Sequence, residues 1–151
     1  MRSPLGELVL TSSGKEITGL YTPDHPFHGK AKIAKNNPIP FKKAIKQLKE
    51  YFAGKRSKFN LPLASGGTAF QKRVWNALHS IPCGETKSYG EVAKSLKSPG
   101  ASRAVGTANS KNPICIFVPC HRVIGATGKL SGYAGGVKAK KWLLDHETNF
   151  K

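Results

Sequence analysis

The sequence predicts an α+β fold in two parts, a small N-terminal domain of strands and one helix over residues 1–66 and a mainly helical C-terminal domain over residues 67–151. Three observations support this prediction. Two short strand-like segments open the chain, the small residues Ser65-Gly66-Gly67 form a linker, and helix-like segments with capping patterns follow the linker. A chain of 151 residues has room for one large or two small domains.

The N-terminal part is expected to begin with a β-hairpin. Leu5 to Leu10 and Glu16 to Tyr21 have strand-like patterns, and the turn-rich segment Thr11-Ser12-Ser13-Gly14 joins them. Residues 22–40 contain four prolines and many small or basic residues, which predicts a loop.

A helix is expected over about residues 40–53, where apolar and basic side chains fall on opposite faces. Its apolar face is formed by Phe41, Ile45, Leu48 and Phe52. Its other face carries Lys42, Lys43, Lys46 and Lys49. Gly54 ends this helix, and residues 55–67 are expected to link the two parts.

The C-terminal part is expected to begin with a helix capped by Thr68, because Gln71 completes a capping box three residues later. Its apolar stripe consists of Phe70, Val74, Leu78 and Ile81. Ser88 and Glu91 repeat the capping pattern at the head of a short second helix. Ser98-Pro99 predicts a third helix, with serine as its cap and proline at its first position.

The second and third of these helices, joined by a short turn, have the pattern of a helix-turn-helix. In the third helix most residues between Gly100 and Ala108 are small, and Arg103 is the one long side chain in its centre. Such a helix suits close approach to the minor groove of DNA, where little sequence can be read. The small residues also suit tight packing against neighbouring helices, and both roles can hold. A final helix is expected over about residues 137–147.

Both parts of the chain are strongly basic. The formal net charge is +17 and the isoelectric point is about 10.1. Residues 1–66 carry twelve Lys and Arg against four Asp and Glu, and residues 67–151 carry thirteen against four. Charge spread in this way favours general attraction to nucleic-acid phosphate over a single basic arm. The alternative is an adaptation for solubility without a nucleic-acid partner.

The three cysteines indicate a reducing compartment, which we take to be the cytoplasm. No N-terminal signal pattern or membrane-spanning apolar run is visible, so no membrane partner is expected. The cysteines lack metal-ligand spacing and most histidines have no ligand-like neighbours, so no metal site is expected. For Cys83 and Cys115 we expect a structural role as buried residues.

The segment Pro119-Cys120-His121-Arg122 is the strongest candidate for chemistry. It follows the apolar, strand-like run from Pro113 to Val118, and its neighbouring cations favour the nucleophilic thiolate of Cys120. Successive side chains of a strand point to opposite faces. His121 therefore needs a turn or a bridging water to take the thiol proton.

Two further features complete this candidate site. A carboxylate would fix the tautomer of His121, and we choose Glu147, although spacing leaves Asp145 open. The glycine-rich segment Gly132-Tyr133-Ala134-Gly135-Gly136 allows close approach of the backbone to a ligand, and Tyr133 offers a stacking face.

Several ordered segments resemble the O6-alkylguanine-DNA alkyltransferase family. They are Asn112-Pro113, Pro119 to Ile124, Gly132 to Gly136, Lys141 to Glu147, Ser88 to Glu91 and Arg103 to Gly106. The resemblance is strong over residues 68–151 and looser over residues 1–66, where it rests on Ser3-Pro4-Leu5-Gly6 and the first hairpin. It implies a ribonuclease-H-like N-terminal domain and a winged-helix-like C-terminal domain.

The resemblance implies a DNA-repair protein, a methylated-DNA–protein-cysteine S-methyltransferase. It would move an alkyl group from O6 of guanine to Cys120 irreversibly and once, with O4 of thymine as a further candidate substrate. No cofactor is implied. The implied partner is double-stranded DNA containing alkylated guanine, and we expect a monomer, with cooperative binding along DNA left open.

The resemblance also implies roles for individual residues. Cys120 accepts the alkyl group, His121 draws off its proton through a water, Glu147 orients His121, and Asn112 braces the site. The flipped base would be held by Tyr133, Val123, Ala134 and Gly135, and Tyr133 would give a proton to the leaving guanine. DNA would be bound by Tyr89, Arg103, Ser102, Ala104, Gly106 and Arg122. Among these, Arg103 would enter the base stack and Tyr89 would press on the adjacent phosphate.

Two departures from the family pattern matter. No cysteine precedes Cys83, so the zinc site that some members hold is not expected here. Ala134 leaves a smaller pocket wall than serine would, which predicts wider tolerance for bulky alkyl groups.

Two other functions remain as alternatives. One is a non-enzymatic sensor of alkylated DNA, and the presence of Cys120 counts against it. The other is a cysteine hydrolase or redox thiol, for which the sequence offers no clear resolving cysteine or oxyanion hole.

Overall fold

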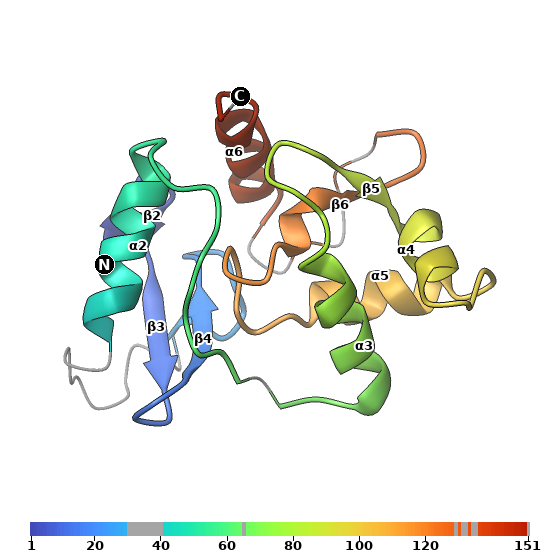
Figure 1. Ribbon diagram of the computed structural model, residues 1–151, viewed down its shortest axis with the longest axis horizontal. Coiled ribbons are helices and arrows are strands. Elements are labelled where there is room, and N and C mark those ends of the chain that lie inside the picture. The colour runs from blue at the N-terminus through green and yellow to red at the C-terminus, as the bar shows by residue number, and fades with distance from the viewer. Residues whose placement is uncertain (30–40, 65, 129, 131–132, 134–135, 151) are drawn as a thin grey trace.

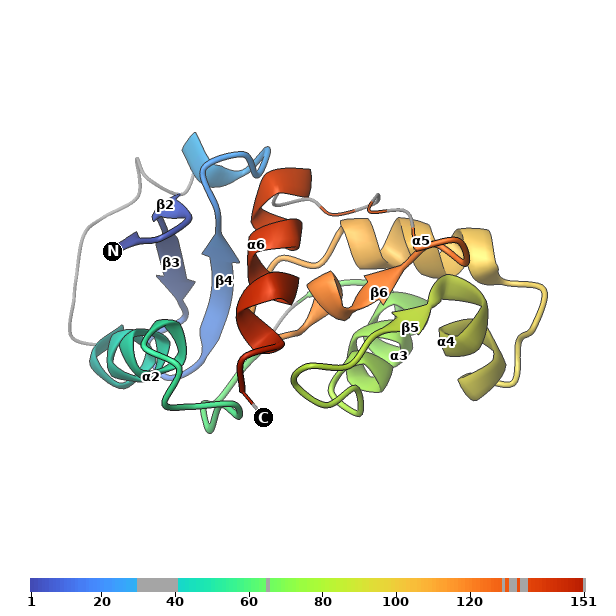
Figure 2. The same ribbon diagram turned by 90° about the horizontal axis from the view of Figure 1, so that it is seen from above.

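The computed structural model describes residues 1–29, 41–64, 66–128, 130, 133 and 136–150. Short strands and helix α2 (Lys42–Phe52) gather at one end of the molecule (Figure 1). Helices α3 (Ala69–Leu78), α4 (Tyr89–Ser95) and α5 (Ser102–Ser110) lie at the other end. Helix α6 (Val137–Glu147) lies between the two groups, as Figure 2 shows. The predicted mixture of strands and helices is confirmed.

The chain opens with a small hairpin that the sequence did not predict. Strand β1 (Arg2–Ser3) pairs in antiparallel fashion with β2 (Gly6–Glu7). Gly6 has a φ of +101°, a backbone conformation that glycine adopts far more readily than other residues. The predicted strand from Leu5 to Leu10 is therefore wrong in its first half, because the chain turns there.

The predicted β-hairpin follows. Strands β3 (Val9–Ser12) and β4 (Ile17–Tyr21) pair in antiparallel fashion, with a register shift at Ser12. Two later segments lie beside β4 through parallel bridges at Leu63 and Ile114. The expected linker and the segment ahead of Cys120 are thus both anchored on the same N-terminal strand.

Helix α2 occupies the predicted position. Its buried face consists of Ala44, Gln47, Leu48 and Tyr51, and its lysines are exposed. Gly54, at a φ of +77°, donates its N–H to the carbonyl of Tyr51 and ends the helix as predicted. Aromatic contacts join α2 and the C-terminal segment through Tyr51, Phe52, Trp142, His146 and Phe150.

Both predicted capping boxes are confirmed. The Thr68 hydroxyl accepts the N–H of Gln71, and the Gln71 side chain accepts the N–H of Thr68. Ser88 and Glu91 make the same reciprocal pair at the start of α4. These local bonds satisfy N–H groups that have no partner within the helix, so the sequence alone placed both helix starts.

The third helix begins later than predicted. Helix α5 starts at Ser102, and its N-cap Ala101 has no capping side chain. Lys97 has a φ of +59°, and the N–H of Ala101 bonds to the carbonyl of Ser98. Residues 97–101 therefore form a longer turn, and the prediction that Ser98-Pro99 opens the helix is wrong.

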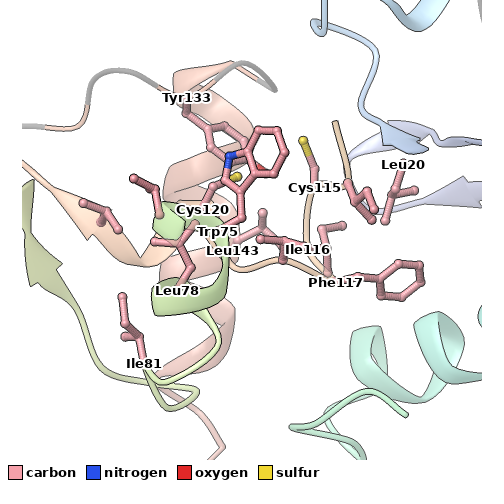
Figure 3. Packing of buried hydrophobic residues seen from close by; sticks show 14 of the residues in the cluster. Leu20, Trp75, Leu78, Ile81, Cys115, Ile116, Phe117, Cys120, Tyr133 and Leu143 are labelled. Atoms are coloured by element: carbon pink, nitrogen blue, oxygen red, sulfur yellow. The ribbon is translucent and has the colours of Figure 1, made fainter. Parts of the chain in front are cut away.

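One buried cluster runs through both parts of the molecule. It joins Leu20 of β4 and Leu48 of α2 to Leu78 of α3 and Leu143 of α6. Figure 3 shows part of this cluster, with Cys115, Cys120 and Tyr133 among its side chains. The segment that carries the candidate nucleophile is thus packed between the two parts. Among the described helices, none is both long and apolar enough to cross a membrane.

Candidate active site

Cys120 lies in a short 3-10 turn, η2 (Cys120–Arg122), and its side chain is 0% exposed. The preceding run, predicted as strand-like, is not a regular strand. Ile116 has a φ of +72°, and Cys115 and Val118 face each other across a local bridge. The alternation of faces expected for a strand therefore does not apply to Cys120 and its successor.

Two buried asparagines hold this turn in place. Asn112 donates to the carbonyls of Ile114 (3.3 Å) and Val118 (3.0 Å), and its oxygen accepts the N–H of Ile114 (3.0 Å). Asn109 donates to the carbonyl of Cys120 at 3.2 Å. Asn112 lies where a bracing residue was predicted, whereas Asn109 was missed. The sequence feature that could have indicated Asn109 is its amide side chain on the buried face of a helix that otherwise consists mostly of small residues.

His121 is fully buried against the carboxylate of Glu147. Its Nε2 lies 2.7 Å from Glu147 Oε2, and its Nδ1 has no hydrogen-bond partner among the described residues. Since the carboxylate accepts, Nε2 carries the proton and Nδ1 is left as a base. Burial lowers the pKa of His121, more than Glu147 raises it, so the imidazole is neutral and able to take a proton.

Glu147 is the centre of a buried polar network. Arg122 donates to both of its oxygens at 2.8 and 3.0 Å, and the Tyr51 hydroxyl donates to Oε2 at 2.6 Å. Burial alone would raise the pKa of Glu147, but bonds and charges from His121 and Arg122 outweigh it and hold that pKa well below its usual range. Asp145, the other carboxylate considered, is exposed and pairs with Lys141.

The structure corrects the role predicted for Arg122 and adds Tyr51. Arg122 was expected to contact DNA, yet it is 7% exposed, and its third nitrogen donates to the carbonyl of Ile81 at 2.7 Å. Its guanidinium neutralises the negative charge of the Glu147 carboxylate. Tyr51 was not predicted, because its partner lies 96 residues away in the sequence.

The surroundings of Cys120 favour its thiolate. Burial alone would raise the pKa of this thiol, but hydrogen bonds with Cys115 and Asn112 and the charge of Lys140 outweigh it and lower the pKa below the ordinary value. Lys140 is 0% exposed, and burial lowers its own pKa to about 8. The sequence did not identify Lys140, because Lys138 and Lys141 lie close to it in α6 and no local pattern marks which lysine is buried.

The predicted base pocket is described in part. Tyr133 is buried, and its hydroxyl has no hydrogen-bond partner among the described residues. Burial raises its pKa, and charge at Cys115 and Cys120 adds to the rise, so the phenol stays protonated as a donor. Val123 is buried in β6 (Val123–Ile124), which pairs in parallel with β5 (Lys87–Ser88). Ala134 and Gly135 lie outside the described residues.

Helix α5 buries one face and exposes the other. Val105, Ala108 and Asn109 are buried, whereas Arg103 and Ala104 are exposed. The exposed side forms a groove with the start of α3, lined by Thr68, Phe70, Gln71, Gly100, Ala101, Arg103, Ala104, Thr107 and Ala108. The small residues thus serve tight packing on one face and leave a smooth surface on the other.

The remaining predicted DNA contacts lie near the same helix. Ser102 begins α5 and Gly106 lies at its middle, both partly exposed. A Cβ added at Gly106 would lie 3.7 Å from the Tyr89 ring, so Tyr89 packs directly over this point of the helix. Ser102, Arg103, Ala104 and Gly106 thus follow one another along α5, and Tyr89 packs against its middle; their contact with DNA stays a prediction.

The other two cysteines differ from each other. Cys115 is fully buried, as predicted, whereas Cys83 is half-buried at the edge of a cleft of about 680 Å³. Burial and Glu147 raise the pKa of Cys83 to about 11, so it is not a second thiolate. The described residues contain no cluster of three or more His, Cys, Asp or Glu that could hold a metal ion.

The fold and the site together define a class of protein in which a buried cysteine is followed by a histidine that is hydrogen-bonded to a buried glutamate, next to the packed helices α3, α4 and α5. The family model described as 6-O-methylguanine DNA methyltransferase, DNA binding domain, matches residues 69–149. The model described as the ribonuclease-like domain of the same protein matches residues 1–65. The chain belongs to the 6-O-methylguanine DNA methyltransferase family.

Individual relatives agree. A Methanosarcina acetivorans protein named methylated-DNA–protein-cysteine methyltransferase is 60% identical over 150 residues, covering 96% of this chain and 94% of that protein. A Mycobacterium bovis protein of the same name is 49% identical over 147 residues, covering 97% and 89%. The crystal structure of Mycobacterium tuberculosis O6-methylguanine methyltransferase matches with a TM-score of 0.92 and 47% identity, covering 100% of this chain and 92% of that one.

Proposed function

We propose that this protein repairs DNA directly, by moving the alkyl group from O6 of guanine onto Cys120 in a single, irreversible turnover. One observation carries the proposal. Cys120 is fully buried with a lowered thiol pKa, and the next residue in the chain is a neutral His121 whose proton is fixed on Nε2 by Glu147. Such an arrangement supplies a nucleophile and a base, which are the two groups that alkyl transfer needs from the protein.

The proposed reaction is a displacement at the alkyl carbon. Nδ1 of His121 takes the thiol proton, through a bridging water as the sequence suggested. Cys120 Sγ then forms a bond to the carbon while the bond from that carbon to guanine O6 breaks, and its electron pair goes to the guanine. Tyr133 donates a proton to the leaving guanine and regains one from His121. In net terms, the proton lost by the Cys120 thiol is balanced by the proton gained by the guanine. The product is a thioether, which no group in the site can cleave.

We further propose that α5 binds the minor groove and that the damaged guanine is flipped into the pocket beside Tyr133. Double-stranded DNA holds O6 within the base stack, out of reach of a buried thiol, so extrusion is required. Exposed Arg103 is the long side chain placed to fill the gap, and the smooth face of α5 allows close approach. The Mycobacterium tuberculosis relative has been crystallised with DNA.

The finer description of the fold is also a proposal. We infer a ribonuclease-H-like domain over residues 1–66, supported by the family model described as a ribonuclease-like domain, and a winged-helix-like domain over residues 67–151, where the second model is described as a DNA-binding domain. We propose a monomer, since one chain supplies Cys120, His121 and Glu147. A cytoplasmic location stays a prediction, and it fits three cysteines that form no disulfide.

Replacing the acceptor tests the proposal. Cys120→Ala should abolish alkyl transfer from a duplex containing O6-methylguanine and leave affinity for that duplex unchanged, because the proposed DNA surface on α5 is untouched. Transfer is measured by intact mass and affinity by fluorescence anisotropy. If the wild type binds the lesion and its mass never changes, the protein is a lesion sensor and the proposal fails.

A further inference from the structure

Tyr51 brings a hydroxyl from the N-terminal part of the chain into the candidate active site. It lies on α2, it is 0% exposed, and its hydroxyl donates to Oε2 of Glu147 at 2.6 Å. The Nε2 of His121 donates to the same oxygen at 2.7 Å. Two buried donors, one from each part of the molecule, thus share one carboxylate oxygen.

The two oxygens of Glu147 are not equally occupied. Oε2 accepts a third bond, from Nη2 of Arg122 at 3.0 Å, whereas Oε1 accepts the Nε of Arg122 at 2.8 Å. Hydrogen bonds to a carboxylate stabilise its negative charge, and a stabilised carboxylate attracts a neighbouring cation less strongly. The donors on Oε2 therefore limit how strongly Glu147 favours a protonated His121.

The position of the Tyr51 hydroxyl is fixed by packing. The carbonyl of Tyr51 accepts the Nε2 of His146 on α6 at 2.7 Å. Burial, and then the charge of Glu147, raise the pKa of Tyr51 far above its ordinary value, so the phenol keeps its proton and acts as the donor. The Tyr51 ring lies 5.4 to 5.7 Å, between centroids, from the rings of Phe52, Phe59 and Phe150.

We propose that Tyr51 is a positioning residue for the alkyl transfer: its hydroxyl holds Oε2 of Glu147 and stabilises the negative charge there, and so keeps the His121 imidazole neutral while Glu147 still fixes its tautomer. A protonated His121 cannot accept the thiol proton, so a carboxylate without this donor would weaken the base. The role in repair rests on the proposed alkyl transfer, but the effect on His121 can be measured without DNA.

Other groups also act on His121, and the test has to leave them unchanged. The charges of Arg122 and Lys140 lower the pKa of His121, after burial, and Glu147 raises it. Removing one hydroxyl deletes none of these groups. Among the described residues, the titratable or charged side chains around the network are His79, Cys83, Cys120, Arg122, Tyr133, Lys140 and His146.

The test is a pH titration of His121 by NMR in the full-length protein, with isotope-labelled histidine so that the ring nitrogens report both protonation and tautomer. His121→Gln assigns the signals by their loss. Tyr51→Phe removes the hydroxyl and keeps the ring, and it should raise the midpoint of His121 by about one pH unit. The proton of the neutral ring should stay on Nε2. The acidic limb of alkyl transfer from an O6-methylguanine duplex should move to higher pH by the same amount.

Two further variants separate this role from packing. Phe52→Leu loosens the packing around the Tyr51 ring and leaves the hydroxyl in place. It should lower the melting temperature without moving the midpoint of His121. A difluorinated tyrosine introduced at position 51 is a stronger donor and should move the midpoint to lower pH, which gives a second reading even where Tyr51→Phe fails to fold.

The outcomes that overturn the inference are specific. They are an unchanged or lowered midpoint in folded Tyr51→Phe, an unmoved midpoint with the fluorinated residue, or an equal shift in Phe52→Leu. Failure of the wild type to react with an O6-methylguanine duplex would instead overturn the proposed function, and the titrations would still decide whether Tyr51 acts on His121.

Discussion

At the scale of single residues, the proposed reaction depends on Glu147. Its carboxylate fixes the tautomer of His121, neutralises the buried Arg122 and accepts the Tyr51 hydroxyl. A buried charge is tolerated only when it is paired, so these three contacts act as a unit. In the proposed reaction the same residue therefore serves both the chemistry and the stability of the fold.

Removing the negative charge of Glu147 should impair both alkyl transfer and the stability of the fold. Glu147→Gln leaves the Arg122 guanidinium buried without a counter-charge, and we expect it to lower the free energy of unfolding by about 3–5 kcal/mol. Alkyl transfer should slow as well, because the tautomer of His121 is no longer fixed. Chemical denaturation and intact-mass kinetics check these outcomes.

Asp145→Asn is the matched control for Glu147→Gln. It removes the same charge two residues away, from an exposed pair with Lys141, and should cost less than about 1 kcal/mol. Equal destabilisation by the two variants would contradict the role of Glu147.

The stabilisation of the fold by Glu147 should also depend on pH in a defined direction. The pKa of Glu147 is depressed, so its stabilisation is present above the ordinary carboxyl pKa and is lost only as pH falls through the low folded value.

Local patterns in the sequence predicted some of these residues and not others. The neighbours of Cys120 identified His121, and the capping boxes at Thr68 and Ser88 placed two helices, because each pattern is complete within four residues. Tyr51 was missed because only the folded chain brings it to Glu147. Spacing could not choose between Glu147 and Asp145, since the choice depends on which face of α6 is buried.

At the scale of elements, α5 is the surface on which the DNA proposal depends. Its start was mispredicted because Ser98-Pro99 fits a helix N-terminus locally, whereas the left-handed Lys97 extends the turn. Its small residues were predicted to suit both close approach to DNA and tight packing; the burial of Val105 and Ala108 bears out the packing, and the DNA contact stays a prediction. The exposed Arg103 remains as the side chain that can act on DNA.

Arg103→Ala should therefore slow alkyl transfer from duplex DNA by about tenfold to a hundredfold, because the cost of extruding the base is no longer offset. Its melting temperature should stay at the wild-type value, since Arg103 is exposed. Lys46→Ala on α2 removes the same charge at the other end of the molecule and serves as the control (Figure 1). Comparable loss in both variants would show that Arg103 acts only through charge.

At the scale of the whole molecule, the two parts are joined where the chemistry lies. Strand β4 carries the segment ahead of Cys120, and Tyr51 of α2 reaches Glu147 at the end of α6. The sequence predicted two parts joined by a linker but could not show this joint. The pairings that make it connect residues far apart in the chain, and no local pattern records them.

The net charge of +17 predicts a steep salt dependence of DNA binding. Each phosphate contact releases counterions, so the logarithm of affinity should fall linearly with the logarithm of salt concentration. Anisotropy titrations over a salt series measure this slope for undamaged duplex. A flat response would show that the charge serves solubility and not phosphate binding.

The most direct test of the account counts alkyl groups. The protein is incubated with a large excess of duplex containing O6-methylguanine, and the methyl groups transferred are followed by intact mass and peptide mapping. We predict that transfer stops at one methyl per protein, located on Cys120, with one guanine restored for each methyl transferred and the excess O6-methylguanine left in the DNA. Continued turnover, or a methyl group on Cys83 or Cys115 instead, would contradict the assignment of Cys120 as an acceptor that is used once.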